Sequence, residues 1–211
     1  MYKRFIKRLL DIVIGLIALP FVLIFIIIFA PIIYFTDKGP VFYNANRIGK
    51  DGKLFKMYKF RSMYVNAPDI RLADGSTYNG ADDPRVTKVG KFMRSTSIDE
   101  LPQLLNMLNG TMSLVGPRPD PPDWLEKYPE NIKVLLTVRP GITGYSQAYF
   151  RNGADGEQKM KNDAYYAQHV SFLFDVKIFF KTIVTVLGHE GTYKDTTDEA
   201  DAVKQAEALR K

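Results

Sequence analysis

The adjacent carboxylates Asp99 and Glu100 are the residues whose type and setting point most directly to chemistry. They follow Arg94 and a run of hydroxyl residues, where a basic segment rich in glycine and proline gives way to a predicted helix. An ionised aspartate can act as a nucleophile or as a ligand of Mg²⁺. The pair therefore predicts a catalytic site for an anionic substrate.

The same spacing also fits a purely structural role. Ser97 and Glu100 form an S-x-x-E capping box, in which Glu100 would only bond the backbone of Ser97. The predicted helix begins near Asp99 and ends near Leu108. The two interpretations are compatible, because a helix start and the nearby Arg94 would both favour the ionised form of Asp99.

Basic residues elsewhere could bind the phosphate groups of such a substrate. Arg118 and Arg139 each lie in a stiff segment of proline and glycine. A stiff backbone would hold a planar guanidinium in place for two parallel hydrogen bonds to phosphate. The candidate anion-binding residues are Lys59, Arg61, Arg94, Arg118, Arg139 and Arg151.

Composition limits the classes of function. The 211 residues carry a formal net charge of +6, which favours anionic partners, and the balance of 46% hydrophobic to 25% charged residues argues against disorder. There is no cysteine, which excludes disulfides and thiolate zinc sites, and two histidines are too few for a multi-histidine metal centre. A nucleic-acid partner is not predicted, because no binding fingerprint accompanies the net charge.

The N-terminal segment is apolar over the length of a membrane. Residues 12–36 carry no charged side chain, and as a helix they would measure roughly 37 Å, enough to cross a hydrocarbon core of about 30 Å. A cleaved signal peptide does not fit, because the run is too long and lacks a small-x-small cleavage site. The simplest prediction is a membrane-spanning anchor.

Two features favour a re-entrant hairpin instead, and both alternatives stay open at this point. Pro20 interrupts the run, where it removes one backbone hydrogen bond and should bend the helix. Basic residues flank both ends of the run, so the positive-inside bias gives no direction across the membrane. A hairpin that enters and leaves on the cytoplasmic side would satisfy both flanks.

The composition becomes that of a soluble domain after Pro40. Short strands at 41–43 and 54–60 flank a turn at 49–52 and predict a β-hairpin. The fold class is therefore α/β, mostly α with a small β-hairpin. Loops are predicted at 66–85, 116–122 and 138–144, and helices at 99–108, 124–128, 163–187 and 195–211, the last with a Thr196/Glu199 capping box.

The predicted helix over 163–187 is strongly apolar and aromatic, with Lys177 and Lys181 on one side. It fits a core helix. It also fits an interfacial amphipathic helix that lies among lipid headgroups, which a lysine-edged aromatic helix suits.

These motifs occur together, in order, in the monotopic phosphoglycosyl transferases, the bacterial sugar transferase family, and the chain resembles that family. Any one motif is weak, whereas the ordered set is specific and extends from the basic N-terminus to about Leu187. The matching segments are Lys59-Phe60-Arg61-Ser62-Met63, Asp83-Pro84-Arg85-Val86-Thr87-Lys88-Val89-Gly90, Arg94–Gln103, Asn106, Gly110, Met112-Ser113, Gly116-Pro117-Arg118-Pro119, Arg139-Pro140-Gly141-Ile142-Thr143-Gly144 and Asp163 before Tyr165-Tyr166.

The resemblance implies an enzyme that moves a phosphosugar from a UDP-sugar to a polyprenol phosphate, such as undecaprenyl phosphate, and releases UMP. It implies that Asp99 is the nucleophile, through a covalent phosphosugar-aspartate, and a ligand of Mg²⁺. Glu100 would support it through Mg²⁺ or by handling the acceptor's proton. Further functional positions of the family match Lys59, Arg94, Arg118 and Asp163.

Two rival hypotheses remain at this point. The chain could be a membrane-anchored binding module without catalysis, with the acidic pair as a helix cap. It could also be a one-step transferase in which Asp99 only binds metal. The sequence does not indicate which UDP-sugar is used or which pathway is served, and a homodimer is left open.

The resemblance also implies a monotopic protein of the bacterial inner membrane, on its cytoplasmic face and in contact with membrane lipid. The expected organisation is a re-entrant membrane helix over 1–37, a cytoplasmic catalytic domain over 38–190 and a polar C-terminal tail over 191–211. Pro20 matches the helix-breaking proline, although Leu19 replaces the serine that often precedes it. The chain is expected to be a small member that consists of the catalytic core.

Overall fold

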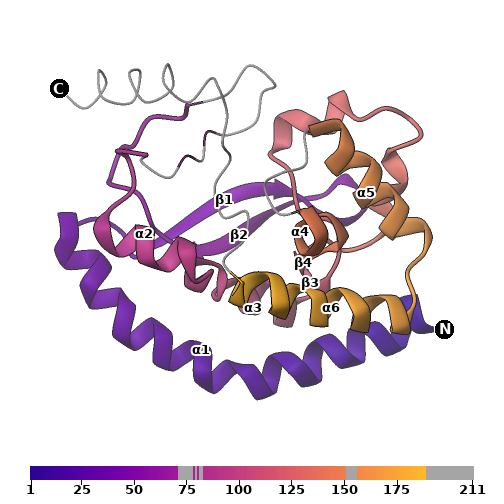
Figure 1. The fold of residues 1–211 in the computed structure, drawn as a ribbon, viewed down its shortest axis with the longest axis horizontal. Coiled ribbons are helices and arrows are strands. Elements are labelled where there is room, and N and C mark those ends of the chain that lie inside the picture. The colour runs from indigo at the N-terminus through magenta and orange to yellow at the C-terminus, as the bar shows by residue number, and fades with distance from the viewer. Residues whose placement is uncertain (71–77, 79, 81–82, 151–155, 189–211) are drawn as a thin grey trace.

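Helices make up most of the part of the chain that the structure describes, together with two small two-stranded sheets (Figure 1). The computed structural model describes residues 1–70, 78, 80, 83–150 and 156–188. The helices in these ranges are α1 (Lys7–Asp37), α2 (Lys88–Ser95), α3 (Gln103–Asn109), α4 (Tyr145–Phe150), α5 (Gly156–Gln168) and α6 (Phe172–Leu187). The strands are β1 (Phe42–Ile48), β2 (Leu54–Phe60), β3 (Ser113–Val115) and β4 (Gly141–Thr143). This arrangement agrees with the predicted, mostly helical α/β fold.

Helix α1 contains the apolar N-terminal run. In the described part of the chain, it is the one helix that is long and apolar enough to cross a membrane. Pro20 and Pro31 both lie inside it, and Figure 1 shows that it is curved and passes below α2, α3 and α6. Proline removes a backbone hydrogen bond and bends a helix. The bend expected at Pro20 therefore lies within a continuous helix, and Pro31 adds a second proline that the sequence interpretation overlooked.

Polar contacts fix the first turns of α1 to the rest of the protein. Lys7 forms an ion pair with Asp175 of α6, at 2.5 Å between Nζ and Oδ2. Arg8 donates two hydrogen bonds, of 2.5 and 2.8 Å, to carbonyls in the last turn of α3. The buried Asp11 accepts hydrogen bonds from β3, including the Leu114 amide at 2.9 Å. The start of the apolar helix is thus tied to both α3 and α6.

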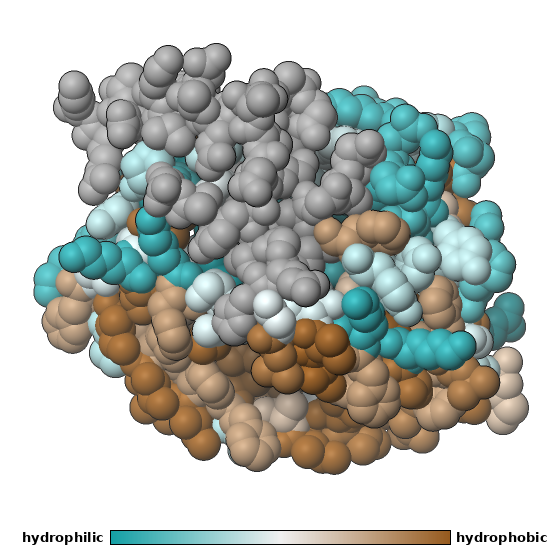
Figure 2. All heavy atoms as spheres, viewed as in Figure 1, coloured by the Kyte–Doolittle hydropathy of each residue, from teal (hydrophilic) through white to brown (hydrophobic). Residues whose placement is uncertain are grey.

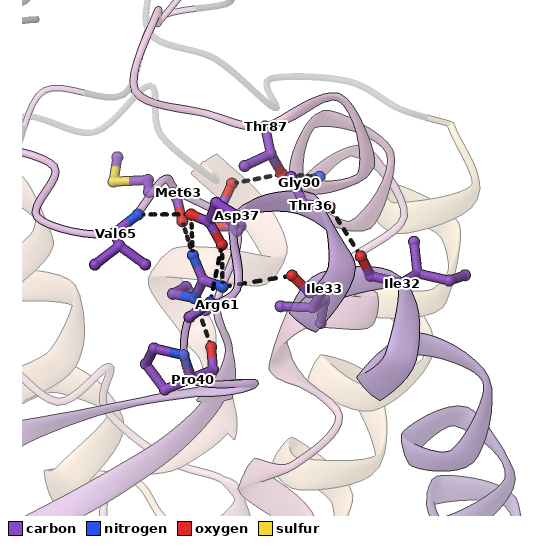
Figure 3. A network of polar contacts seen from close by, with 12 residues as sticks. Ile32, Ile33, Thr36, Asp37, Pro40, Arg61, Met63, Val65, Thr87 and Gly90 are labelled. Carbon is purple, nitrogen blue, oxygen red and sulfur yellow. Dashed lines mark hydrogen bonds and ion pairs between the residues drawn. The ribbon is translucent and has the colours of Figure 1, made fainter.

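The end of α1 is held by a second cluster, shown in Figure 3. Both carboxylate oxygens of Asp37 lie 2.6 Å from the guanidinium nitrogens of Arg61, which follows β2 directly. Arg61 also donates to the carbonyls of Pro40 at 2.5 Å and Met63 at 3.1 Å, and the Val65 amide donates to Asp37 at 2.8 Å. Both ends of α1 are therefore bound to the same protein body. We call the ion pair of Asp37 and Arg61 the α1 clamp.

The predicted β-hairpin is confirmed, although its first strand runs over Phe42–Ile48 instead of the predicted 41–43. β1 and β2 pair antiparallel from Phe42 opposite Phe60 to Ile48 opposite Leu54, around the expected turn. A second sheet, in which β3 and β4 run parallel, was outside the prediction. Each of its strands has three residues, too short to leave a periodic pattern in the sequence.

Glycine is required where the second sheet meets the loop that follows β3. A Cβ on Gly141 would lie 2.1 Å from the Gly116 backbone nitrogen, and one on Gly116 would lie 2.4 Å from the Arg139 carbonyl oxygen. Two backbones can approach this closely only without side chains. The glycines of the Gly-Pro-Arg-Pro and Arg-Pro-Gly motifs thus bring the two segments together.

Two hydrophobic clusters connect the elements that carry the site. Phe29 and Ile33 of α1 pack with Phe60 of β2 and Met93 of α2. On the other side, residues of α5 pack against Ile48 and the turns that follow β3. The members of that cluster are Ile48, Tyr128, Ile132, Leu135, Val138, Ala164 and Ala167.

The single helix predicted over 163–187 is wrong in its extent. Two helices replace it, because α5 ends at Gln168 and α6 begins at Phe172. Ser171 is the N-cap of α6 and accepts a hydrogen bond from the Phe174 amide at 3.3 Å, with Asp175 in the first turn. A serine N-cap and an early acid are a standard start signal, which the apolar pattern concealed.

Helix α6 is not a core helix. In it only Asp175 and Ile178 are buried, whereas Leu173, Phe180 and Val184 are exposed. Figure 2 shows hydrophobic side chains gathered along the lower side of the molecule, over α1 and α6, and hydrophilic ones mainly at the upper right. Isolated exposed apolar residues are ordinary, but a continuous apolar side marks an interaction surface. The helix predicted over 195–211 and its capping box lie outside the described residues.

Candidate functional site

Three segments bring the candidate catalytic residues together. Lys59 lies near the end of β2, and Asp99 and Glu100 lie in a short 3₁₀ turn, Ile98–Glu100, between α2 and α3. Arg118 follows β3 in the Gly-Pro-Arg-Pro segment. The turn is set by Ser97, whose left-handed backbone (φ 58°) reverses the chain after α2. Residues far apart in sequence therefore meet at one acidic turn.

Glu100 is held between two cations. Its Oε1 accepts a hydrogen bond from Lys59 Nζ at 2.7 Å and another from Arg118 Nη2 at 3.0 Å. Burial by itself would raise the pKa of Glu100, but Arg118 and Lys59 outweigh it and hold the pKa well below the usual range of a glutamate. Glu100 is therefore an anion at neutral pH, and it orients both cations.

Asp99 has a different environment, although it is the next residue. Only 8% of it is exposed, and its carboxylate forms no hydrogen bond or ion pair with any residue that the structure describes. Burial is the main cause that raises the pKa of Asp99; Lys59 opposes this shift and the Glu100 charge adds to it. An acidic oxygen without a protein partner is available to a ligand or an electrophile.

The prediction that a helix begins near Asp99 is wrong. Helix α3 begins at Gln103, with Pro102 as its N-cap residue, so Asp99 lies before the helix rather than in its first turn. The capping box is wrong as well, because Ser97 makes no side-chain cap and the Glu100 carboxylate binds Lys59 and Arg118. The net shift of the Asp99 pKa is upward, so burial decides it rather than a helix dipole.

Arg94 lies on the side of the site formed by α2. This helix begins after Thr87, which caps it by accepting from the Gly90 amide at 2.9 Å. Arg94 Nε donates to Ser62 Oγ at 2.9 Å, and its charge opposes the upward shift of the Asp99 pKa. The structure thus brings Lys59, Arg94 and Arg118, three of the six predicted anion-binding residues, near the acidic pair.

Two of the predicted anion-binding residues have other partners. Arg61 is buried in the α1 clamp with Asp37. Arg139 donates from Nε to the Gly110 carbonyl oxygen at 2.7 Å, just past the end of α3. Both guanidiniums fix the fold at these contacts, so the structure does not gather them with Glu100. Arg151 lies outside the described residues.

Asp163 lies in a separate polar group behind the Arg118 segment. It is 1% exposed, neither carboxylate oxygen makes a hydrogen bond with a residue that the structure describes, and Lys159 Nζ lies 3.1 Å from its Oδ2. Burial, opposed by Lys159 and reinforced by Asp120, raises the pKa of Asp163 to about 6. Because it is enclosed, Asp163 does not form the surface of the site in this structure.

The sequence interpretation missed three residues of this group, Asp120, Tyr128 and Lys159. Lys159 Nζ lies 2.8 Å from both carboxylate oxygens of Asp120, and the Tyr128 hydroxyl donates to Asp120 Oδ2 at 2.8 Å. Lys159 and Asp163 stand four residues apart, which is the spacing of a helical ion pair and was a readable signal. Asp120 and Tyr128 gave no such signal, because they lie in an irregular proline-rich segment.

Mg²⁺ fits the donors of this site as a cation shared with a substrate. Among the described residues there is no group of three or more acidic or histidine side chains that could enclose a metal ion. Asp99 and the second oxygen of Glu100 are hard ligands without a hydrogen-bond donor in the described part of the chain. Mg²⁺ commonly binds one or two carboxylates and completes its shell with phosphates and water.

Comparison with known proteins gives the same family that the motifs indicate. The bacterial sugar transferase family matches residues 2–189. Undecaprenyl-phosphate galactose phosphotransferase of Salmonella typhimurium is 39% identical over 208 residues, covering 90% of this chain and 42% of the relative. A protein of Aeromonas hydrophila named UDP-N-acetylgalactosamine-undecaprenyl-phosphate N-acetylgalactosaminephosphotransferase is 40% identical over 189 residues, covering 87% and 44%.

A shorter relative matches over most of its own length. The exopolysaccharide production protein ExoY of Sinorhizobium fredii is 39% identical over 199 residues, which cover 89% of this chain and 88% of that protein. Against the longer relatives, the chain spans less than half of their length. The extent of the family match, with the ordered motifs and the acidic pair between cations, shows that the chain belongs to the bacterial sugar transferase family.

Proposed function

We propose that the protein transfers a phosphosugar from a UDP-sugar to a polyprenol phosphate, such as undecaprenyl phosphate, and releases UMP. The observation that carries this proposal is the contrast within the acidic pair. Glu100 is bound by Lys59 and Arg118, whereas the buried Asp99 carboxylate has no partner among the described residues. The names of the Salmonella and Aeromonas relatives support the same reaction class.

In the first step, a carboxylate oxygen of Asp99 attacks the β-phosphorus of the UDP-sugar. The bond between that phosphorus and the oxygen bridging to the α-phosphorus breaks, and UMP leaves with the bridging oxygen. In the second step, a phosphate oxygen of the polyprenol phosphate attacks the same phosphorus and releases the Asp99 carboxylate. The covalent intermediate divides the transfer into two displacements, so the anionic donor and the anionic acceptor need not react with each other directly.

The cations around Glu100 serve the negative charge of both substrates. Arg118 has 41% of its side chain exposed, so donors remain for a phosphate beside the one that binds Glu100. Lys59 is more enclosed and adds a second positive charge. Preorganised cations stabilise charge that builds up on the transferring phosphoryl group. When bound, Mg²⁺ would add further neutralisation of the phosphate oxygens, with Asp99 as its protein ligand.

Glu100 has a double role in this proposal. Its charge keeps Lys59 and Arg118 in place, at 2.7 and 3.0 Å, before any substrate arrives. Its depressed pKa makes it a poor proton acceptor at neutral pH, which suits an electrostatic support. The acceptor is already an anion when it attacks, so little proton transfer is needed.

We also propose that the reaction takes place on the cytoplasmic face of a bacterial inner membrane, with α1 as a re-entrant helix. The clamp at Asp37 and the contacts of Lys7 tie both ends of α1 to one protein body. A straight spanning helix would place those ends on opposite sides of the bilayer. The apolar side formed by α1 and α6 would then lie in the membrane, at the depth of the polyprenol phosphate (Figure 2).

A screen for UMP release tests the proposal. Purified protein in nanodiscs would receive a panel of UDP-sugars with Mg²⁺, with undecaprenyl phosphate or with undecaprenol, which lacks the phosphate. We expect multiple turnovers with at least one UDP-sugar, only when the phosphorylated lipid is present. Failure to release UMP from any UDP-sugar, or equal turnover with undecaprenol, would contradict the proposed reaction.

A further inference from the structure

Lys159 joins the phosphate-binding segment to helix α5. Its Nζ lies 2.8 Å from both carboxylate oxygens of Asp120 and 3.4 Å from the Arg118 carbonyl oxygen. It also lies 3.1 Å from Asp163, one turn further along α5. One ammonium group thus contacts the backbone of Arg118, the side chain two residues later, and a buried carboxylate of its own helix.

Two further hydrogen bonds hold Asp120 in place. The Asp120 carbonyl oxygen accepts from the Ile48 amide at 2.9 Å, at the end of β1. The Tyr128 hydroxyl donates to Asp120 Oδ2 at 2.8 Å. Lys159 therefore links Asp120 both to the Arg118 backbone and to helix α5.

The charges in the group favour the bound form of Lys159. Burial by itself would lower the pKa of Lys159, but Asp163 and Asp120 outweigh it and raise the pKa, so the side chain is an ammonium ion. The Lys159 ammonium faces two carboxylates. Glu100 is the main cause that raises the pKa of Arg118, and the Asp120 charge adds to it. Arg118 lies between this group and Glu100, so both neighbours define its position.

We propose that Lys159 is a positioning residue for Arg118. By fastening the Arg118 carbonyl and the Asp120 carboxylate to α5, it keeps the guanidinium beside Glu100, where it can bind the diphosphate of a nucleotide sugar. This inference rests on the proposed function for the identity of the ligand. It assigns Asp163 the role of an anchor for Lys159 rather than of a direct substrate contact.

The test must separate this role from a general loss of stability. Removing Lys159 alone would leave the carboxylates of Asp163 and Asp120 without their cation, and the more deeply buried Asp163 would be the costlier of the two. The reference protein is therefore Asp163→Asn, which removes the charge and keeps the size. Lys159→Met and Arg118→Met are introduced into it singly and together. Lys161→Met in the same reference is the matched control, because Lys161 is exposed and pairs with Glu157 on the same helix.

The first readout is kcat/KM for UMP release. Lys159→Met should lower it by about 10- to 100-fold, the scale of loss when a binding group shifts by about 1 Å. In the Arg118→Met protein the same change should lower it by less than about threefold, because residues that act through one another are non-additive. Lys161→Met should have no effect. An equal loss with and without Arg118, or no loss at all, would overturn the proposal.

The second readout is independent of activity. Hydrogen exchange of the Ile48 amide reports whether the Asp120 segment stays docked, because Asp120 is its acceptor. Lys159→Met should accelerate this exchange at least about tenfold, and Lys161→Met should leave it unchanged. Unchanged exchange in the Lys159→Met protein would overturn the proposed hold on the segment. A protein that releases no UMP from any UDP-sugar would instead contradict the proposed function, while the exchange result still decides the role of Lys159.

Discussion

Replacement of Arg61 by methionine tests whether the α1 clamp stabilises the fold. The guanidinium is 7% exposed and binds both oxygens of Asp37 at 2.6 Å (Figure 3). Removing it leaves the Asp37 carboxylate with the Val65 amide at 2.8 Å and the Gly39 amide at 3.4 Å. Loss of one partner from a buried ion pair costs about 3–5 kcal/mol, and the partial exposure of Asp37 argues for the lower end, about 3 kcal/mol.

The expected shift is large enough to measure. In a protein of this size, 1 kcal/mol changes Tm by about 2–4 °C, so Arg61→Met should lower Tm by about 6–12 °C. The assay is thermal unfolding of the full chain in a fixed detergent or nanodisc, followed by intrinsic fluorescence. Lys53→Met removes an exposed charge from the same hairpin and should change stability by less than about 0.5 kcal/mol. Equal Tm values for the two variants would refute the reasoning.

Three further predictions concern the anion-binding residue Arg118, the proposed topology of helix α1 and the buried Asp163. Arg118→Lys keeps the charge but loses the planar fork, and kcat/KM for UMP release should fall more than tenfold, a barrier increase above about 1.4 kcal/mol; near-wild-type turnover would leave Arg118 a purely electrostatic role. Cysteines placed at Lys3 and Lys53 should both be protected from an impermeant thiol reagent on intact cells, and labelling of only one would restore a spanning helix. Burial raises the pKa of Asp163 to about 6, so ionisation of Asp163 lowers the free energy of unfolding. This loss of stability is absent below the ordinary aspartate pKa of about 3.9 and develops as the pH rises from there through about 6. The difference in Tm between Asp163→Asn and wild type should therefore increase in favour of the variant from pH 4 to pH 7, and a constant difference would contradict this account.

The sequence alone predicted the elements whose signal lies in neighbouring residues. Residues 42–60 combine alternating strands with a glycine turn, and the hairpin is confirmed in its predicted place. The apolar run of α1 and the acidic pair were equally readable, since their signal lies in consecutive residues. The ordered motifs were enough to indicate the family.

Long-range contacts explain what the sequence could not show. Arg61 and Arg139 carry the same charge as Arg118, and Arg139 also shares its proline and glycine setting. Each nevertheless meets an acceptor from a distant segment, Asp37 in one case and Gly110 in the other. The parallel pairing of β3 and β4 joins segments more than twenty residues apart and left no periodic pattern. Ser171, by contrast, was a readable N-cap, and the apolar run around it led to the prediction of one helix instead of two.

Intact mass spectrometry tests the central claim, that Asp99 is the nucleophile. Wild-type protein is given its UDP-sugar and Mg²⁺ without any lipid acceptor, next to Asp99→Asn, which keeps the size of the side chain but has no nucleophilic carboxylate. The account predicts that the wild type gains the mass of one phosphosugar, that peptide mapping places it on the segment containing Asp99, and that EDTA suppresses it, while Asp99→Asn gains nothing and releases no UMP. An adduct on another residue, or turnover by Asp99→Asn, would contradict the account.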